Sequence, residues 1–188
     1  HTNGAGQQAT DRKRAQGGHV WNAQGTGTGL FNLTGNLADN ILTGNTSANT
    51  IDGGEGNDAL NGGAGNDILR GGFGHDTVNG GSGNDTFLFG NGDGQDLIQG
   101  NSGAADKLLF DGGINPLDLV ISRQANNLRL TIHDSSDQIT VQNWFVGTTN
   151  RTETIQAGNG QTLLSTQVDQ LIQAMTGFTN TTGLSWDD

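Results

Sequence analysis

Residues 53–88 read GGEGNDALN, GGAGNDILR, GGFGHDTVN and GGSGNDTFL, four consecutive copies of one nine-residue unit. The copies share Gly at positions 1, 2 and 4, Asp at position 6 and an apolar residue at position 8. Glycines at this density permit left-handed backbone without a Cβ clash, whereas positions 7 to 9 suit a very short strand. The unit therefore predicts a turn followed by a strand, repeated along the chain.

Weaker copies flank the four strong ones. The stretches GNLADNILT (35–43) and GNTSANTID (44–52) keep Gly at position 1 and an apolar residue at position 8, but they place Asn40 and Asn49 at position 6. After the insertion Phe89-Gly90, the stretch NGDGQDLI (91–98) restores positions 2, 4, 6 and 8 with Gly92, Gly94, Asp96 and Ile98. The repeat frame therefore predicts one continuous array over residues 35–98.

Position 8 predicts how the units pack. Its occupants are all apolar: Leu42, Ile51, Leu60, Leu69, Val78 and Phe87. One inward residue in nine cannot bury a single unit, so the units must stack, with two units to a coil and coils about 4.8 Å apart. Units n and n+2 are then neighbours on the same side of the coil.

The sequence on either side of the repeats has a different pattern. Residues 1–34 predict a flexible or linker-like segment, and residues 99–164 a β-rich cap with strands near 106–110, 117–122, 127–132, 137–145 and 152–157. Residues 165–188 predict an amphipathic helix, stopped by Gly177, and a tail. The expected fold is all-β: a parallel β-roll (β-helix) of nonapeptide repeats, a short antiparallel β cap and a C-terminal helix.

Composition excludes several classes of function. The chain has 33 Gly and no Cys among 188 residues, so it has no disulfide framework, thiolate metal site or cysteine nucleophile. A formal charge of −11 disfavours nucleic acid as a partner and favours cations. No apolar run is long enough to span a bilayer, and the first 30 residues lack the apolar stretch of a cleavable secretion signal. We expect no enzyme activity from these residues.

The repeated aspartates carry the strongest functional signal. Stacking by two units sets Asp58 above Asp76 and Asp67 above Asp85. Like charges at that spacing repel, so a divalent cation held by carboxylates and backbone carbonyls resolves the conflict, and flexible all-oxygen sites favour Ca²⁺ over Zn²⁺ or Mg²⁺. In a single copy the pattern would simply be a turn, but four copies in one frame favour an ion. Farther along the chain, four aspartates lie close together in the sequence: Asp93, Asp96, Asp106 and Asp111. For these residues a further cation site and solvated turns are equally open alternatives.

These residues resemble a known family. Units 53–88 are similar to the G-G-x-G-x-D-x-U-x nonapeptide of the repeats-in-toxin (RTX) calcium proteins. The stretches GDGQDLI (92–98), DKLLFDGGI (106–114) and DQITVQNWF (137–145) resemble the haemolysin-type calcium-binding related region that often follows such repeats.

The resemblance implies Ca²⁺ between stacked loops, held by position-6 carboxylates and by carbonyls of the glycine-rich turns. The side-chain ligands it implies are Asp58, Asp67, Asp76, Asp85 and, beyond the insertion, Asp96. The turn glycines it implies are Gly53, Gly54, Gly56, Gly62, Gly63, Gly65, Gly71, Gly72, Gly74, Gly80, Gly81 and Gly83.

The resemblance also implies a biological setting. Family members are exported from Gram-negative bacteria by type I secretion machinery that reads an uncleaved C-terminal signal, and the predicted helix at 165–176 would suit such a signal. The expected function is a non-catalytic calcium-binding module of a larger secreted, extracellular protein that folds on binding Ca²⁺. Two alternatives stay open: a calcium-dependent adhesion or carbohydrate-binding module that contacts a glycan or cell surface, and an accessory domain of a secreted hydrolase or toxin.

Overall fold

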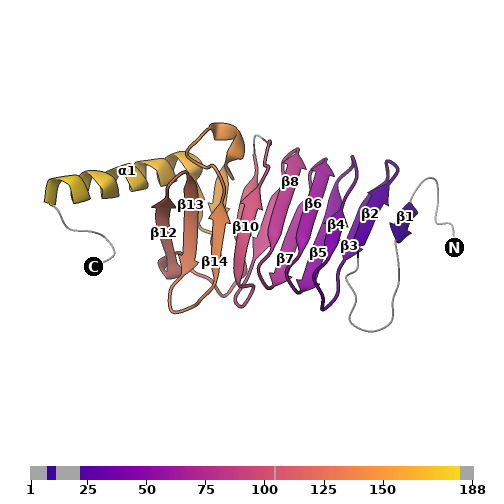
Figure 1. Ribbon diagram of the computed structural model, residues 1–188. Helices are drawn as coiled ribbons and strands as arrows, with labels where there is room; N and C mark the ends of the chain where they lie inside the picture. Colours follow the sequence, from indigo (N-terminus) through magenta and orange to yellow (C-terminus); the bar gives the residue numbers. More distant parts are fainter. Residues whose placement is uncertain (1–7, 12–21, 104, 183–188) are drawn as a thin grey trace.

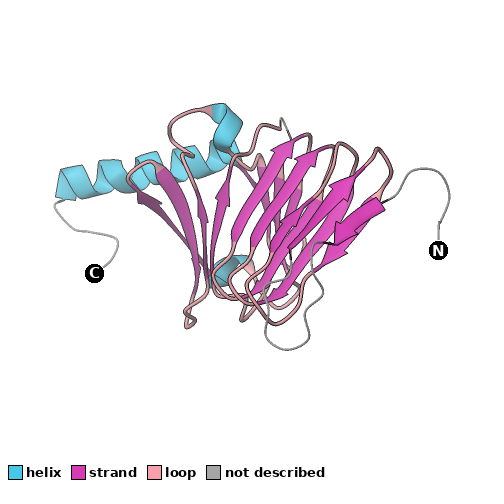
Figure 2. Cartoon of the chain, turned by 45° about the vertical axis from the view of Figure 1, so that its right-hand side comes forward, coloured by secondary structure: helices cyan, strands magenta, loops and turns pink. Residues whose placement is uncertain are grey.

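The structure is a computed structural model that describes residues 8–11, 22–103 and 105–182. Short strands follow one another around a flattened coil and alternate between two sheets that face each other (Figures 1 and 2). The turns between strands lie along the two edges of this coil. The all-β architecture with a parallel β-roll and a C-terminal helix is therefore confirmed.

Each sheet takes every second strand of the repeats. In spatial order the nine-stranded sheet contains β1 (Gln8–Asp11), β2 (Asn22–Thr26), β4 (Ile41–Thr43), β6 (Ala59–Ala64), β8 (Thr77–Ser82), β10 (Gln95–Gln99), β14 (Gln138–Val141), β13 (Asn127–Ile132) and β12 (Leu119–Gln124). The seven-stranded sheet contains β16 (Thr162–Leu164), β15 (Thr154–Gln156), β11 (Lys107–Phe110), β9 (Thr86–Phe89), β7 (Ile68–Phe73), β5 (Asn49–Glu55) and β3 (Phe31–Thr34).

Strand register confirms stacking by two units. Leu60 pairs with Val78 in one sheet, and Leu69 pairs with Phe87 in the other, so each residue lies beside its equivalent one coil later. The strands are longer than positions 7 to 9. Strand β6, for example, runs through Gly62 and Gly63 of the next unit, because glycines without side chains let the extended backbone continue to the edge of the coil.

Position 8 builds the core. In the column that continues position 8 along the coil, the first sheet contributes Leu42, Leu60, Val78, Ile98 and Val141, and the second sheet contributes Leu33, Ile51, Leu69, Phe87, Leu108 and Ile155. All of them belong to one apolar cluster, which also takes in the cap residue Trp144. A single column of side chains from each sheet therefore holds the coil and its cap together.

The coil extends beyond the repeats at both ends. Strands β2 and β3 add in parallel upstream of residue 35, inside the stretch that the sequence suggests is linker-like. Downstream, β14 and β15 also add in parallel, although the sequence predicts an antiparallel cap. Only β12, β13 and β16 complete the cap in antiparallel fashion. Turns between neighbouring strands favour antiparallel pairing within the cap. Strands β14 and β15, however, pair in parallel with β10 and β11 at the open edges of the last coil.

One helix, α1 (Ser165–Thr182), packs on the end of the cap (Figure 1). Gly177 lies inside this helix, so the predicted C-terminal stop is wrong. A glycine within a helix costs only about 1 kcal/mol, which neighbouring turns can offset. Val168 and Ile172 are buried in the core cluster, while Asp169 accepts hydrogen bonds from Trp144 Nε1 (3.2 Å) and Arg151 (2.6 Å).

Short 3-10 turns at Pro116–Asp118 and Thr148–Asn150 complete the described elements of the cap. The predicted tail at 183–188 lies outside the described residues. Nowhere in the described ranges does a helix combine the length and apolar character needed to cross a lipid bilayer.

Neighbouring residues of β7 provide a test of the core column. Leu69 is 1% exposed and Ile68 is 42% exposed. We expect Leu69→Ala to lower the free energy of unfolding by about 2–5 kcal/mol, since it leaves a cavity in the column. The matched variant Ile68→Ala should lower it by less than about 1 kcal/mol. Urea denaturation under identical ionic conditions measures both, and equal losses would contradict the one-column core.

Candidate metal centre

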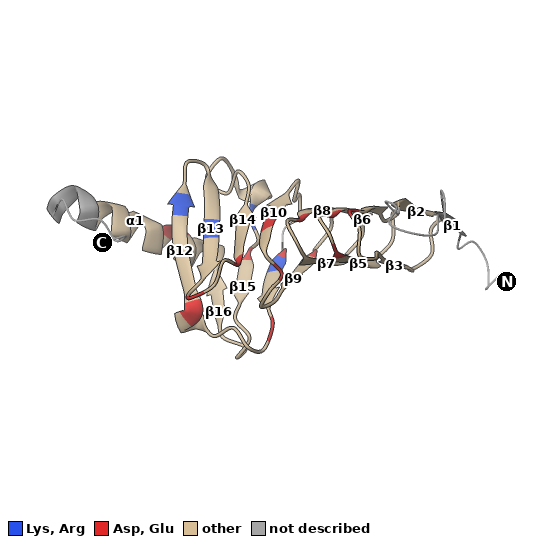
Figure 3. Ribbon diagram, turned by 60° about the horizontal axis from the view of Figure 1, so that its bottom comes forward, with Lys and Arg blue, Asp and Glu red and all other residues tan. Residues whose placement is uncertain are grey.

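Polar side chains form two rows along the edges of the coil. One row lies at the start of the strands of the nine-stranded sheet, and the other lies at the start of the strands of the seven-stranded sheet. In Figure 3 the acidic residues, in red, succeed one another along both edges of the repeats. The first ladder consists of Asn40, Asp58, Asp76 and Asp96, and the second ladder of Asn49, Asp67, Asp85, Asp106 and Glu153. Both ladders take the position-6 residue of successive coils, so the predicted pairing of Asp58 with Asp76 and of Asp67 with Asp85 is present.

One carboxylate oxygen of each aspartate ties two coils together. The backbone N–H of Asp58 donates to Asp76 Oδ1 (2.7 Å), and that of Asp67 donates to Asp85 Oδ1 (2.9 Å). Asp96 continues the first ladder by accepting from Asp76 N–H (3.0 Å). Each turn therefore has a backbone donor satisfied by the side chain of the coil that follows.

The other carboxylate oxygen has no partner. In the four strong repeats, the Oδ2 atoms of Asp58, Asp67, Asp76 and Asp85 are buried and lack any hydrogen bond. These four residues are at most 2% exposed. Burying an acceptor without a donor costs about 1–3 kcal/mol, and more when the group is charged. Four such oxygens in one frame therefore require a positive partner or a proton.

The position-1 glycine makes room for this oxygen. A Cβ on Gly53 would collide with Asp58 Oδ2 and with the carbonyl oxygen of Gly71 in the next coil. A Cβ on Gly62 would collide with Asp67 Oδ2 and with the carbonyl oxygen of Gly80. Each of these spaces is thus bordered by a carboxylate and a carbonyl oxygen from adjacent coils, an arrangement that suits a hard cation.

The remaining turn glycines set the backbone path. Those at position 2 have φ between +90° and +104°, and those at position 4 have φ between +110° and +144°. At Gly74, for example, a Cβ would also collide with the carbonyl oxygen of Gly56, so close approach of the coils requires glycine there. Of the twelve glycines predicted for the site, those at positions 1 and 2 therefore lie near the ends of strands β5 to β8, and those at position 4 follow these strands.

Burial sets the charge state of the ladders. Loss of solvent raises the pKa of Asp67 to about 6, of Asp76 to about 7 and of Asp96 to about 8. Burial also raises the pKa of Asp58 and of Asp85. The backbone donor from the preceding coil lowers each pKa and neighbouring aspartates raise most of them, but the burial effect is the largest. Without a cation, these groups therefore keep their protons to higher pH than exposed carboxyl groups do.

Side chains alone do not complete a metal site. Across the described ranges, no three His, Cys, Asp or Glu side chains gather closely enough to hold an ion. An ion at the ladders would take one carboxylate oxygen and complete its shell with backbone carbonyls. Ca²⁺, which accepts six to eight oxygen ligands in flexible geometry, fits such a donor set.

The two asparagine turns close by themselves. Asn40 Oδ1 accepts from Asn36 N–H (2.8 Å), and Asn40 Nδ2 donates to Asn36 Oδ1 (3.3 Å). Asn49 and Asn45 repeat both bonds at 2.8 Å and 3.1 Å. The amide therefore replaces an open carboxylate oxygen with a satisfied group.

The acidic group near the insertion divides into separate roles. Asp93 and Asp111 both bind the guanidinium of Arg70, at 3.2 Å and 3.1 Å. Asp96 lies in the first ladder and Asp106 in the second. The four residues therefore do not converge on one site, although the sequence leaves that option open.

Sequence reasoning missed Glu153 and the place of Asp106. The described residues after β10 continue the coil, because Gly103 lies against the carbonyl oxygen of Gly83, as Gly74 lies against that of Gly56, and Asp106 accepts from Asp85 N–H. The stretch GNSGAAD (100–106) keeps two glycines and the aspartate but adds a residue before it. This partial match to the repeat could have predicted the position of Asp106 in the ladder, whereas Glu153 belongs to no repeat.

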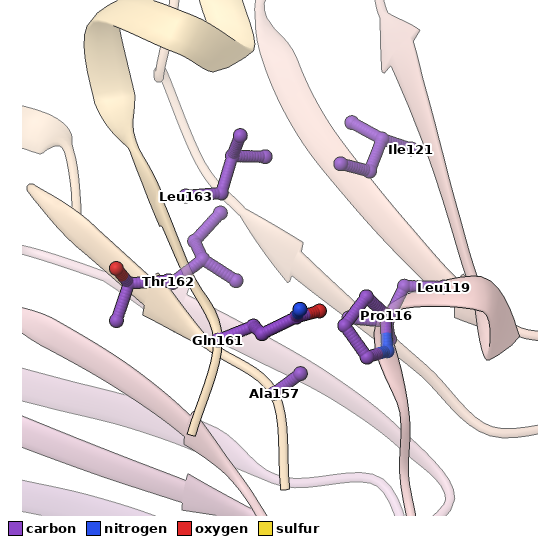
Figure 4. Close-up of a pocket in the computed structure, with 8 residues that line it drawn as sticks. Pro116, Leu119, Ile121, Ala157, Gln161, Thr162 and Leu163 are labelled. Atoms are coloured by element: carbon purple, nitrogen blue, oxygen red, sulfur yellow. The ribbon is translucent and has the colours of Figure 1, made fainter. Parts of the chain in front are cut away.

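A cavity of about 360 Å³ lies at the cap end, away from the repeats in sequence (Figure 4). Apolar side chains such as Leu119, Ile121 and Leu163 line it, together with the amide of Gln161. No lining residue has an acidic, basic or thiol side chain. Its polar side chains are those of Gln161 and Thr162.

Two protein-family models match the chain. The model of the RTX calcium-binding nonapeptide repeat (4 copies) matches residues 34–69 and 61–95. The model of the haemolysin-type calcium binding protein related domain matches residues 127–165. A comparison with curated proteins finds no match for the chain. The two family models together cover just over half of the chain, one on the coil and one on the cap. The chain thus contains RTX haemolysin-type calcium-binding nonapeptide repeats, which bind Ca²⁺, followed by a haemolysin-type calcium binding protein related domain.

Proposed function

We propose that this chain is a non-catalytic, Ca²⁺-driven folding module of a larger secreted protein. The observation that carries the proposal is the set of buried, unpartnered carboxylate oxygens in the four strong repeats. Because a cation stabilises only the form in which these oxygens are brought together, binding favours the folded coil. The ion therefore supplies stability that one apolar side chain per unit cannot.

The proposed ligands are the ladder carboxylates and the turn carbonyls. Full sites between coils join Asp58 to the turn of Asp76, and Asp67 to the turn of Asp85. The support is the carbonyl oxygen of Gly71 beside Asp58 Oδ2 and that of Gly80 beside Asp67 Oδ2. Asp96 would extend the first ladder across the insertion, where its Oδ1 bonds to Asp76 N–H.

The setting that fits this mechanism is export from a Gram-negative bacterium by type I secretion machinery. RTX repeats are characteristic of secreted bacterial proteins. Extracellular Ca²⁺ modules bind with dissociation constants of about 10⁻⁴ to 10⁻³ M. Sites in that range stay empty in the cytosol and fill outside, so the chain would pass the exporter unfolded and fold in the extracellular medium.

The adhesion or carbohydrate-binding alternative has less support. Carbohydrate recognition would use an exposed aromatic surface, but Trp144 of the cap is fully buried. Phe145 is half-buried beneath the guanidinium of Arg123, at 4.4 Å from the ring centre. A role as accessory domain of a hydrolase or toxin would leave the proposed folding mechanism unchanged.

The first test is a Ca²⁺ titration followed by far-ultraviolet circular dichroism. With chelator present, residues 35–98 should be largely disordered, since they combine many glycines with stacked carboxylates. Ca²⁺ should produce a cooperative gain of β signal, and Mg²⁺ at equal concentration should not. A spectrum that is already folded in chelator would overturn the proposal.

The second test compares two ladder residues. Asp67→Ala removes a charged oxygen and should raise the midpoint Ca²⁺ concentration for folding by at least about tenfold, or about 1.4 kcal/mol. Asn40→Ala removes an amide that closes its own turn without an ion. It should therefore shift the midpoint much less. Equal shifts of the midpoint would refute the assignment of ligands.

The third test uses pH. In the folded state without an ion, the ladder carboxyls have a higher pKa than in the unfolded state. For Asp76 the pKa is about 7, against an ordinary value of 3.8. Folding without the ion therefore takes up protons. Stability of the ion-free coil should therefore fall as pH rises from about 4 to 8. Ca²⁺ affinity should rise over the same window, because protons compete for the same oxygens. Circular dichroism in EDTA between pH 4 and 8 measures the small β signal of the ion-free chain, and Ca²⁺ titrations at pH 5 and 8 measure the affinity. An ion-free signal that does not change with pH would contradict the first trend.

A further inference from the structure

Buried polar atoms without partners also gather outside the strong repeats, at the junction of coil and cap. In the described part of the chain they include Asp106 Oδ2, Thr152 Oγ1, Asn79 Oδ1 and both side-chain polar atoms of Asn101. Asp106 and Asn101 both lie between β10 and β11 at the end of the coil, and the side chain of Asn79 packs against Gly100, next to Asn101. Arg129 Nε on β13 is a further unpartnered atom of the cap, but the other groups belong to the end of the coil or to Thr152, next to Glu153.

Hydrogen bonds hold the two contributing segments side by side. The backbone N–H of Asp106 donates to Glu153 Oε2 (2.8 Å), and the N–H of Thr154 donates to the carbonyl oxygen of Asp106 (3.1 Å). Strand register continues this contact, because Lys107 pairs with Thr154. Thr152 and Glu153 thus approach the turn from the cap while Asp106 belongs to the coil.

The buried groups form an oxygen-rich set. Asp106 and Thr152 are completely buried and Asn101 is 4% exposed. Together with Glu153 they offer two carboxylates, an amide oxygen and a hydroxyl, the hard neutral and anionic oxygens that Ca²⁺ prefers. Neither carboxylate forms an ion pair with a Lys or Arg side chain among the described residues. The charge of the site is therefore not balanced by the protein.

We propose a further Ca²⁺ site at the junction of coil and cap, with Asp106, Glu153, Asn101 and Thr152 as its side-chain ligands. Its turn lies beyond residue 95, where the match to the nonapeptide repeats ends. The proposal rests on the proposed function for the identity of the ion, but it adds a ligand from the cap, Glu153. An ion here links the order of the cap directly to Ca²⁺.

The first experiment compares the only two glutamates of the chain. Glu153→Gln keeps an oxygen that accepts from Asp106 N–H but removes the charge. Glu55→Gln makes the same change at an exposed turn position of the repeats. Equilibrium dialysis of the full chain with radioactive Ca²⁺ should show one fewer bound ion for Glu153→Gln and an unchanged number for Glu55→Gln. Circular dichroism in saturating Ca²⁺ checks that both variants fold.

The second experiment remains decisive if Glu153→Gln fails to fold. Thr152→Val replaces a buried, unpartnered hydroxyl with a methyl group of similar size. At the lowest Ca²⁺ concentration at which both chains fold, this variant should be as stable as the parent or more stable, since an unsatisfied polar group is removed. With Ca²⁺, it should gain less in melting temperature than the parent, because a ligand is lost.

The outcomes separate the two proposals. If the parent chain binds no Ca²⁺, the proposed function fails and the junction site fails with it. If the parent binds Ca²⁺ but Glu153→Gln binds as many ions with equal affinity, and Thr152→Val gains as much from Ca²⁺ as the parent, only the junction site is overturned. Buried water would then satisfy these groups.

Discussion

The bond from a backbone N–H to the carboxylate of the following coil is the constraint on which the rest of this structure depends. It places Asp58, Asp67, Asp76 and Asp85 inside the coil, where one oxygen is satisfied and the other is not. The same bond brings adjacent turns close enough that only glycine fits between them. Fold and ion binding therefore follow from one interaction rather than from two separate features.

The apolar column and the carboxylate ladders both contribute to the stability of the coil. The column is thin, since each unit contributes one buried side chain, and it cannot resist charge repulsion at both edges unaided. The asparagine turns at the N-terminal end avoid this conflict because Asn40 and Asn49 satisfy their own turns. The array therefore joins self-sufficient turns to turns that need a cation, in a fixed order along the chain.

The sequence predicts the repeats well because each depends on residues within nine positions. The apolar residue at position 8, the turn glycines and the aspartate all fall where the pattern places them. The cap is harder, since β14 and β15 join the coil through contacts distant in sequence. Glu153 replaces a position-6 aspartate 47 residues after Asp106, and no local pattern marks it. Gly177 misleads because its helix is held by packing at Val168 and Ile172.

The ladders have a direction. In every step the carboxylate belongs to the later coil and the N–H to the earlier one, so each coil is completed by the one that follows, and Glu153 of the cap completes the last step of the second ladder. The two ends of the array are therefore not equivalent. Removal of the first coil leaves the remaining backbone donors satisfied, whereas removal of the cap leaves Asp106 N–H without its acceptor. The cap thus completes the second ladder at the end where a backbone donor would otherwise lack its acceptor, so truncations at the two ends of the array have unequal consequences.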